Sequence, residues 1–391
     1  MLDIEALRAE TPGTTNRIHL NNAGAALMPK PVVDAVRHHL DREEAIGGYE
    51  AKDEAGVALE AIYDSVARLI CANREEIALV ENATVAWNKA FFAIPFKDGD
   101  RILTSESEYG ANYIGYLQTA KWKGAKVEVI PNDSSGAVDP EALRAMLDDR
   151  VRLISITHIP TNGGLVNPAE EIGKIAREHG ILYLLDACQT AGQLPIDVTA
   201  IGCDMLSVTG RKFLRGPRGT GFLYVRSGIM DIMEPPMIDH FAANWVDAET
   251  YTLRDDARLF ELWENNYAAR LGLGVAVDYA LALGGDAIRD RALTLAARLR
   301  DGLSAIPGIT VRDLGHMKCA IVTFDAGETS AEDIAGTLEQ RQIICSISTA
   351  DSTILDFNAR QLPSLVRLSP HYYNTEAEID TTLDLIAKTV Q

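Results

Sequence analysis

The chain has 391 residues, more than one ordinary hydrophobic core needs, so we expect one large domain and one smaller domain. It is 47% hydrophobic and 24% charged, which is typical of a folded globular protein and not of a disordered one. The net charge of −19 argues against binding to nucleic acids or to anionic membranes, since both need a basic face. A small anionic ligand remains compatible with this charge, because a few local donors suffice to bind a phosphate.

The cysteines and the N-terminus indicate a reduced, cytoplasmic protein. The five cysteines are scattered and lack C-x-x-C spacing, so they predict neither a disulfide framework nor a zinc site: Cys71, Cys188, Cys203, Cys319 and Cys345. Residues 1–8 include acidic side chains where a signal peptide carries positive charge. No apolar run approaches the roughly 20 residues of a membrane span.

Two helices are predicted before any regular alternation begins, apart from a short helix over residues 3–10. Apolar side chains recur at helical spacing over 29–43 and again over 54–72. Between the short helix and the first of these, residues 17–24 form an apolar-to-polar run that ends in a glycine turn.

From residue 77 onward, short apolar runs alternate with helical stretches such as 169–179. The predicted strands are 77–80, 101–104, 126–130, 153–157, 181–185, 205–208 and 221–225. Strands that are apolar on both faces and alternate with helices imply a parallel sheet covered by helices on both sides.

The C-terminal part changes in character after a long helix rich in alanine and leucine over 265–283. It predicts a small α+β domain, with helices over 288–306, from 331 and from 376, and strands over 309–311, 319–324, 343–347 and 365–368. We therefore expect a large domain over 26–280 and a small domain over 281–391, with residues 1–25 packing against the small domain.

A polar, glycine-rich stretch over 207–221 carries Lys212 near its centre, between two apolar runs. Thr209 and Arg211 flank this lysine with a hydroxyl and a fixed positive charge. A lysine in a tight polar turn can form a Schiff base if burial or a neighbouring cation discharges its ammonium. On this stretch alone, a surface turn with a solvated lysine is the alternative.

Two more positions suggest a ligand beside Lys212. Asp186 follows the strand 181–185, at the edge where open parallel sheets bind ligands, and could hold a protonated pyridine nitrogen or simply cap a helix. Thr84 begins a helix whose free N–H groups make an anion site, which Thr209 and Arg211 would complete. A pyridine partner, a phosphate site and a lysine together describe pyridoxal phosphate.

The order of these motifs resembles the class V aminotransferase family of fold-type I pyridoxal-phosphate enzymes. That family includes cysteine desulfurases, isopenicillin N epimerase-like proteins and ergothioneine-pathway C–S lyases. The matching segments are 20–24, 81–84, 105–112, 157–168, 186–189, 209–219 and 366–375. The resemblance implies an α/β protein of PLP-dependent transferase fold type I, with a mainly parallel mixed sheet in the large domain, and a homodimer.

The resemblance also implies a role for each matching residue. Lys212 forms the Schiff base and moves the proton, Asp186 pairs with the pyridine nitrogen, and Tyr109 stacks on the ring. The implied cofactor contacts are Ala83, Thr84, Tyr109, Thr161, Asp186, Gln189, Thr209, Arg211 and Lys212. For an amino-acid substrate, Arg367 grips the α-carboxylate, with Asn22 and Asn112 as further contacts.

The chain departs from the family pattern at two places. Thr161 stands where the family usually has an asparagine, with Asn162 next to it. Glu264 stands where a threonine reaches the neighbouring subunit's phosphate, and a carboxylate would repel that phosphate. Trp263 either shapes the pocket or packs in the core.

The sequence separates the possible reactions poorly, because the cofactor supplies the chemistry. A cysteine desulfurase needs a nucleophilic cysteine on the loop over 346–360, and this loop has none. We therefore expect an aminotransferase ahead of a C–S lyase or an epimerase-like enzyme, and not a cysteine desulfurase. A non-catalytic scaffold would be expected to lack Lys212 or Asp186, and the glycines after Lys212 precede a strand, which is the wrong context for a nucleotide site.

Overall fold

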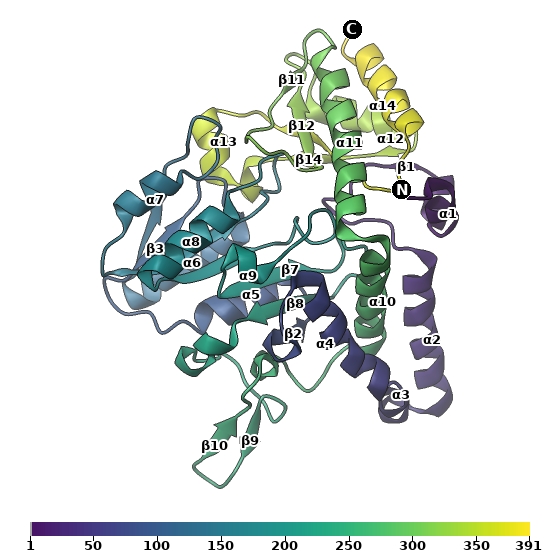
Figure 1. The fold of residues 1–391 in the computed structure, drawn as a ribbon. Helices are drawn as coiled ribbons and strands as arrows, with labels where there is room; N and C mark the ends of the chain where they lie inside the picture. Colours follow the sequence, from purple (N-terminus) through teal and green to yellow (C-terminus); the bar gives the residue numbers. More distant parts are fainter. Residues whose placement is uncertain (1) are drawn as a thin grey trace.

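A seven-stranded mixed sheet lies at the centre of the computed structural model, which describes residues 2–391 (Figure 1). The strand order is β2-β8-β7-β6-β5-β3-β4. The strands are β2 (Ile77–Val80), β3 (Arg101–Thr104), β4 (Lys126–Val129), β5 (Val151–Thr157), β6 (Leu182–Asp186), β7 (Met205–Thr209) and β8 (Gly221–Val225). Only β8 runs antiparallel to its neighbours in this sheet, so the prediction of a mainly parallel mixed sheet is confirmed.

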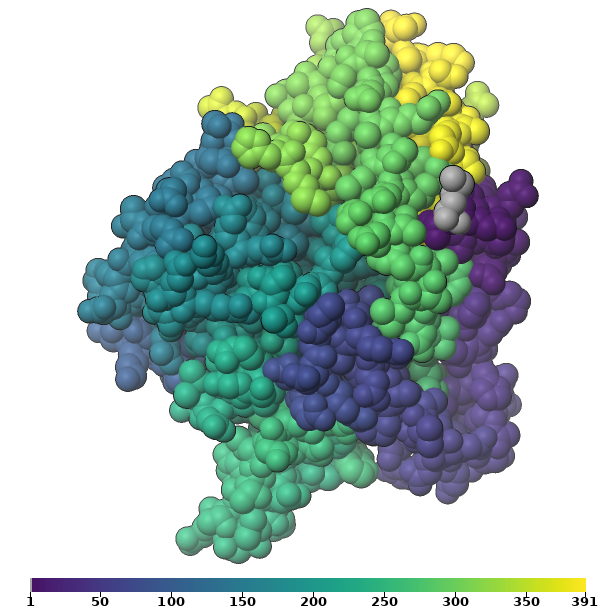
Figure 2. Space-filling model, viewed as in Figure 1, coloured from purple at the N-terminus to yellow at the C-terminus, as the bar shows by residue number. Residues whose placement is uncertain are grey.

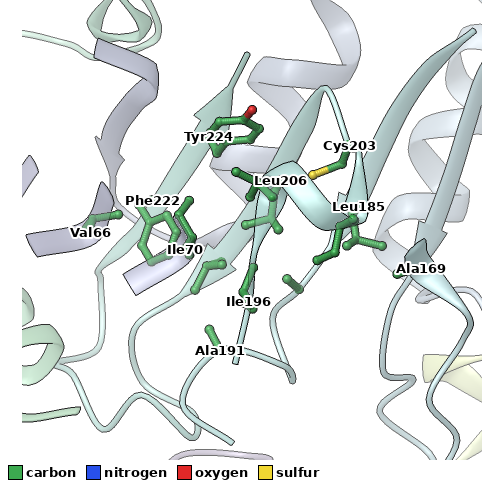
Figure 3. Packing of buried hydrophobic residues seen from close by; sticks show 14 of the residues in the cluster. Val66, Ile70, Ala169, Leu185, Ala191, Ile196, Cys203, Leu206, Phe222 and Tyr224 are labelled. Carbon is green, nitrogen blue, oxygen red and sulfur yellow. The ribbon is translucent and has the colours of Figure 1, made fainter. Parts of the chain in front are cut away.

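Helices cover both faces of this sheet because its strands are apolar on both faces. They are α4 (Gly56–Ile70), α5 (Ala83–Phe92), α6 (Gly110–Lys123), α7 (Pro140–Met146), α8 (Ala169–His179), α9 (Val198–Ile201) and α10 (Tyr267–Leu283). On one face Leu206 and Phe222 pack with Ile70 of α4 (Figure 3). On the other face the alternate residues Met205 and Leu223 join the cluster of α5 and α6, as the two-residue period of a strand requires.

The N-terminal helices pack against other helices of the molecule. They are α1 (Ile4–Ala9), α2 (Lys30–Ile46) and α3 (Gly48–Glu54), and α2 lies along α10. The helix α3 was not predicted, because only a sharp turn at Gly47, with φ of 101°, separates it from α2. Gly47 adopts a backbone conformation that other residues rarely take.

A four-stranded antiparallel sheet and its helices form the C-terminal part. The elements are α11 (Gly285–Ser304), β11 (Thr310–Val311), β12 (Val322–Asp325), α12 (Ala331–Gln340), β13 (Ile343–Ile344), β14 (Ser346–Ser348), α13 (Ile354–Arg360), β15 (Leu365–Leu368) and α14 (Glu376–Thr389). The sheet order is β11-β12-β15-β14. The strand predicted over 343–347 is wrong as one element, because β13 pairs with the N-terminal β1 (Ile18–His19) and β14 pairs with β15.

A hairpin of β9 (Ala243–Trp245) and β10 (Tyr251–Leu253) projects from the body of the molecule, which Figures 1 and 2 both show. It was not predicted, and Trp245 on it is 81% exposed. Within residues 2–391, no single helix is long and apolar enough to cross a membrane, and α10 and α11 meet that test only together, across an 83° bend.

Candidate active site

A cavity of about 420 Å³ lies where β5, β6 and β7 end at their carboxyl ends. It gathers most of the predicted site residues from segments far apart in the sequence. The lining residues are Asn82, Ala83, Thr84, Val85, Tyr109, Asn112, Thr157, Ile159, Thr161, Asp186, Cys188, Gln189, Thr209, Arg211 and Lys212. This is the edge at which open α/β sheets bind ligands.

Lys212 follows β7 in a tight turn closed by backbone hydrogen bonds. Arg215 N donates to Lys212 O at 2.9 Å, and Gly216 N donates to Gly210 O at 2.7 Å. Burial, helped by the positive charges of Arg211 and Arg367, lowers the pKa of Lys212 to about 8, although Cys188 and Asp186 oppose this shift. The alternative of a solvated surface lysine is therefore wrong, and the amine is partly neutral near pH 7 to 8.

Asp186 ends β6 and is buried at the bottom of the cavity. Its Oδ1 accepts from Cys188 N at 2.9 Å, and its Oδ2 accepts from the Asn112 amide at 2.9 Å. Each carboxylate oxygen carries a further lone pair, so one more donor can be accommodated. The alternative role of Asp186, as a cap for the following backbone, explains the hydrogen bond to Oδ1 but not the one to Oδ2.

The N-terminus of α5 faces the same cavity. Its cap Asn82 accepts from Val85 N at 3.0 Å, and Ala86 N bonds back to Asn82 O at 3.0 Å. The backbone N–H groups of Ala83 and Thr84 find no acceptor within residues 2–391. With Thr209 and Arg211 also in the lining, this end of the cavity suits a phosphate.

Arg367 on β15 brings a second positive charge to the site. Its Nη1 donates to Thr161 O at 2.9 Å and to Thr161 Oγ1 at 2.7 Å. Its Nη2 lies 3.4 Å from Asn21 Oδ1, and its buried Nε has no hydrogen-bond partner in the described part of the chain. Burial lowers the pKa of Arg367 to about 10, which is the expected response of a guanidinium that lacks a carboxylate partner.

Thr161 links the cofactor and substrate sides of the cavity. Its Oγ1 accepts from Arg367 and also from Gln189 Nε2, the latter at 3.1 Å. Both of these partners donate, so the Thr161 hydroxyl keeps its own proton available for an acceptor inside the cavity. Tyr109 also lines the cavity, partly exposed at the N-terminus of α6, and partial burial raises its pKa.

The two asparagines predicted to contact the substrate differ in position. Asn22 lies outside the cavity lining, where its amide donates to Ser369 O at 2.7 Å and its Oδ1 accepts from Tyr373. Its neighbour Asn21 is the one that meets Arg367. Asn112 does line the cavity, but its amide nitrogen is already engaged with two carboxylates, of Asp186 and Glu108.

Trp263 and Glu264 do not belong to this cavity. They line a separate hollow together with Tyr49, Lys52 and Tyr267. Trp263 is 40% exposed and stacks near His240, with ring centres 4.7 Å apart, so the expectation of a packed core tryptophan is wrong. The role expected for Glu264 at a neighbouring subunit's phosphate stays a prediction.

The residues in the cavity fit pyridoxal phosphate. Gln189 Oε1 is buried and lacks a hydrogen-bond partner among residues 2–391, as a group awaiting a ligand would. Lys212 offers a partly neutral amine, Asp186 offers a buried carboxylate, and α5 offers free N–H groups for the phosphate. Five lining residues were not among the predicted contacts: Asn82, Val85, Thr157, Ile159 and Cys188. Asn82, Val85 and Cys188 each lie next to a predicted contact in the chain.

Comparison with known proteins identifies relatives of almost the same length. A probable cysteine desulfurase of Methanothermobacter thermautotrophicus is 31% identical over 392 residues, covering 98% of both chains. The apo structure of a cysteine desulfurase from Thermococcus onnurineus has a TM-score of 0.93 and 26% identity, over 100% of this chain and 98% of that one. Structures of C-DES, at 21% identity and TM-scores of 0.88 and 0.87, include one with glycine linked to its PLP cofactor and one of this cystine C–S lyase with cysteine persulfide.

These relatives correct the expected reaction. The absence of a cysteine in residues 346–360 was taken to exclude a cysteine desulfurase and to favour an aminotransferase, and this conclusion is wrong. Proteins that are similar to this chain from end to end bear the name cysteine desulfurase.

The fold and the cofactor agree with one family. The sequence model of the aminotransferase class-V family matches residues 18–382, and cysteine desulfurases belong to that family. The cofactor is pyridoxal phosphate, as in these relatives and as the cavity residues require. The chain belongs to the class V aminotransferase family of pyridoxal-phosphate enzymes.

Proposed function

We propose that the chain is a cysteine desulfurase-type lyase, which removes sulfur from cysteine and leaves alanine. The observation that carries the proposal is that Lys212 and Asp186 line one cavity, while Arg367 is hydrogen-bonded to Thr161 in the wall of that cavity. The relatives that match this chain from end to end are named cysteine desulfurases, and from these names we infer that the broken bond is the C–S bond of cysteine. When bound, pyridoxal phosphate supplies an electron-withdrawing ring that stabilises negative charge at the substrate carbon.

The protein's own groups bind and orient the amino acid. Arg367 Nη1 and Nη2 are held by Thr161 and Asn21, so the guanidinium is fixed before a substrate arrives. A buried guanidinium without a carboxylate partner suits an α-carboxylate, which would form a bidentate pair with it. Lys212 Nζ, with a pKa lowered to about 8, can accept and return a proton at the substrate carbon near neutral pH.

We propose that the sulfur acceptor is a thiol from outside the cavity. The loop segment over 349–353 carries no cysteine, and burial raises the pKa of the Cys188 thiol in the cavity well above its usual value. Thiolates, not thiols, attack sulfur. The balanced reaction is cysteine plus an external thiol giving alanine plus the persulfide of that thiol, with the cysteine C–S bond broken and the sulfur transferred.

Product analysis tests this function. The purified enzyme with pyridoxal phosphate is incubated with cysteine and a small external thiol, and alanine, pyruvate, ammonia and persulfide are quantified. Alanine and persulfide in equal amounts are expected, with a rate that rises with the thiol concentration. Pyruvate and ammonia in place of alanine would indicate β-elimination and contradict the proposal, and so would a persulfide formed on the protein without any added thiol.

A further inference from the structure

We propose that Glu108 is a positioning residue for Asp186: through the Asn112 amide it fixes the carboxylate that meets the pyridine nitrogen, and its own negative charge reinforces that carboxylate. The proposal rests on the cofactor and on the predicted role of Asp186, and not on which substrate bond is broken. It can therefore hold even if the cysteine assignment fails.

Glu108 lies between β3 and α6 and is only 3% exposed. Its Oε1 accepts from Asn112 Nδ2 at 2.9 Å, from Thr157 Oγ1 at 2.5 Å and from Tyr109 N at 2.9 Å. Its Oε2 accepts from Thr104 Oγ1 at 3.0 Å and from Thr157 N at 3.1 Å. Two backbone N–H groups and one amide can only donate, so this surrounding favours an ionised carboxylate.

Asn112 connects this carboxylate to the site. Its Nδ2 lies 2.9 Å from Glu108 Oε1 and 2.9 Å from Asp186 Oδ2. A primary amide nitrogen has two hydrogens, so each carboxylate receives one. The reverse orientation of the amide would place its oxygen against two carboxylates, which fixes the assignment. Glu108, Asn112 and Asp186 thus form one buried chain of hydrogen bonds.

This chain sets both geometry and charge at the bottom of the cavity. With Oδ2 held by Asn112 and Oδ1 held by Cys188 N, the Asp186 carboxylate cannot rotate away from the cavity. When Glu108 is ionised, two buried carboxylates joined by a neutral amide create a strongly negative potential, since charges act over longer range in a poorly solvated interior. That potential favours a proton on a ring nitrogen facing Asp186.

Glu108 gains or loses its proton near neutral pH. Burial and the negative charge of Asp186 raise the pKa of Glu108 to about 7, against the lowering effect of hydrogen bonds from Thr157, Asn112 and Tyr109. The titratable groups that face Glu108 are Asp186 on β6 and Tyr116 on α6, and burial keeps the pKa of Tyr116 well above its usual value. Tyr116 therefore stays neutral, and the carboxylate pair dominates the local charge.

Substitution E108Q in the holoenzyme tests the proposal, because it removes the charge and keeps the shape. The pH at which the visible absorbance of the bound cofactor titrates is expected to fall by about one unit, as one nearby negative charge is lost. Release of cofactor on dialysis is expected to quicken, because Asp186 is less firmly oriented. Both readouts are independent of turnover.

Two further variants separate this role from general stability. E106Q removes a neighbouring, half-buried carboxylate that faces Asn132 and Asp356 instead of Asp186, and it should leave both readouts unchanged. Asn112→Leu breaks the bridge and leaves the other four donors of Glu108 in place, so it should move both readouts in the same direction as E108Q.

The outcomes decide the matter. A shift in E108Q and in Asn112→Leu, with no further shift in the double variant, supports the positioning role. A folded E108Q whose titration midpoint matches that of the wild type overturns it, even if its melting temperature is lower. If E108Q does not fold, Asn112→Leu alone decides by the same two readouts, and an unchanged midpoint in that variant overturns the proposal.

Discussion

The two ends of the central sheet carry hollows that differ in kind. At the amino ends of β3, β5 and β6, a hollow of about 650 Å³ is lined by charged side chains that pair in contact with water, as Arg144 does with Glu178 at 2.8 Å. At the carboxyl ends the cavity is smaller, about 420 Å³, and it holds the buried Asp186 and the partly exposed Lys212, whose pKa is lowered to about 8. Cavity volume therefore does not identify the active site, whereas charged groups with shifted pKa values do.

The largest expected effect comes from removing the amine at the carboxyl end. Lys212→Ala should lower the turnover of cysteine by at least about 10³-fold, because among residues 2–391 no other lining residue offers an amine with a lowered pKa. The variant should also lose the borohydride-stable attachment of the cofactor, which absorbance of the denatured protein after reduction measures. Retention of that attachment would contradict the assignment of Lys212.

Arg367→Ala tests the substrate side of the same cavity. Loss of its guanidinium should lower kcat/KM for cysteine by a factor that corresponds to about 2–5 kcal/mol of lost binding energy. Most of this loss should appear as a higher KM, since a buried carboxylate would lose its partner. Steady-state kinetics measures the two constants. Arg298→Ala is the matched control, because Arg298 on α11 pairs with Asp380 in an exposed position and should leave both constants unchanged. An unchanged KM in Arg367→Ala would count against a carboxylate site.

Buried charge at this end should also appear as a pH-dependent stability. The folded-state pKa of Lys212 is about 8 and its usual value is 10.5, so the unfolded chain binds more protons between these pH values. The stability of the apoprotein should therefore rise with pH across that window, by about 3 kcal/mol at most from this group. Lys212→Met should lack this rise. Urea unfolding of both apoproteins at several pH values measures the difference, and parallel curves would refute it.

The same contrast explains which features the sequence could predict. Asp186 is the last residue of β6 and Lys212 lies three residues after the end of β7. Parallel strands bring their carboxyl ends to one edge, so the meeting of these two residues followed from the order of the strands. The start of α5 at Ala83 likewise followed from a strand giving way to a helix. The anchoring role of Arg367 rested on resemblance, because β15 belongs to another sheet and its approach to Thr161 depends on how the two parts pack.

The missed features depend on single side-chain directions. Glu108 was not among the predicted site residues, although its spacing of four from Asn112 is one at which side chains on a helix can meet. The choice between Asn21 and Asn22 turns on one residue, and neighbours in an extended segment point to opposite sides. Trp263 is large and apolar, which favours burial, and no pattern in the surrounding sequence indicated that its segment lies at the surface.

The smallest expected effect lies at the amino ends of the strands. Arg144→Ala removes one partner of an exposed ion pair, and water and salt already screen such pairs. Turnover should be unchanged, and the melting temperature should move by about 2 °C or less. Steady-state kinetics and a thermal scan measure both. A large loss of turnover would mean that the larger hollow takes part in the reaction, and the contrast between the two ends of the sheet would then fail.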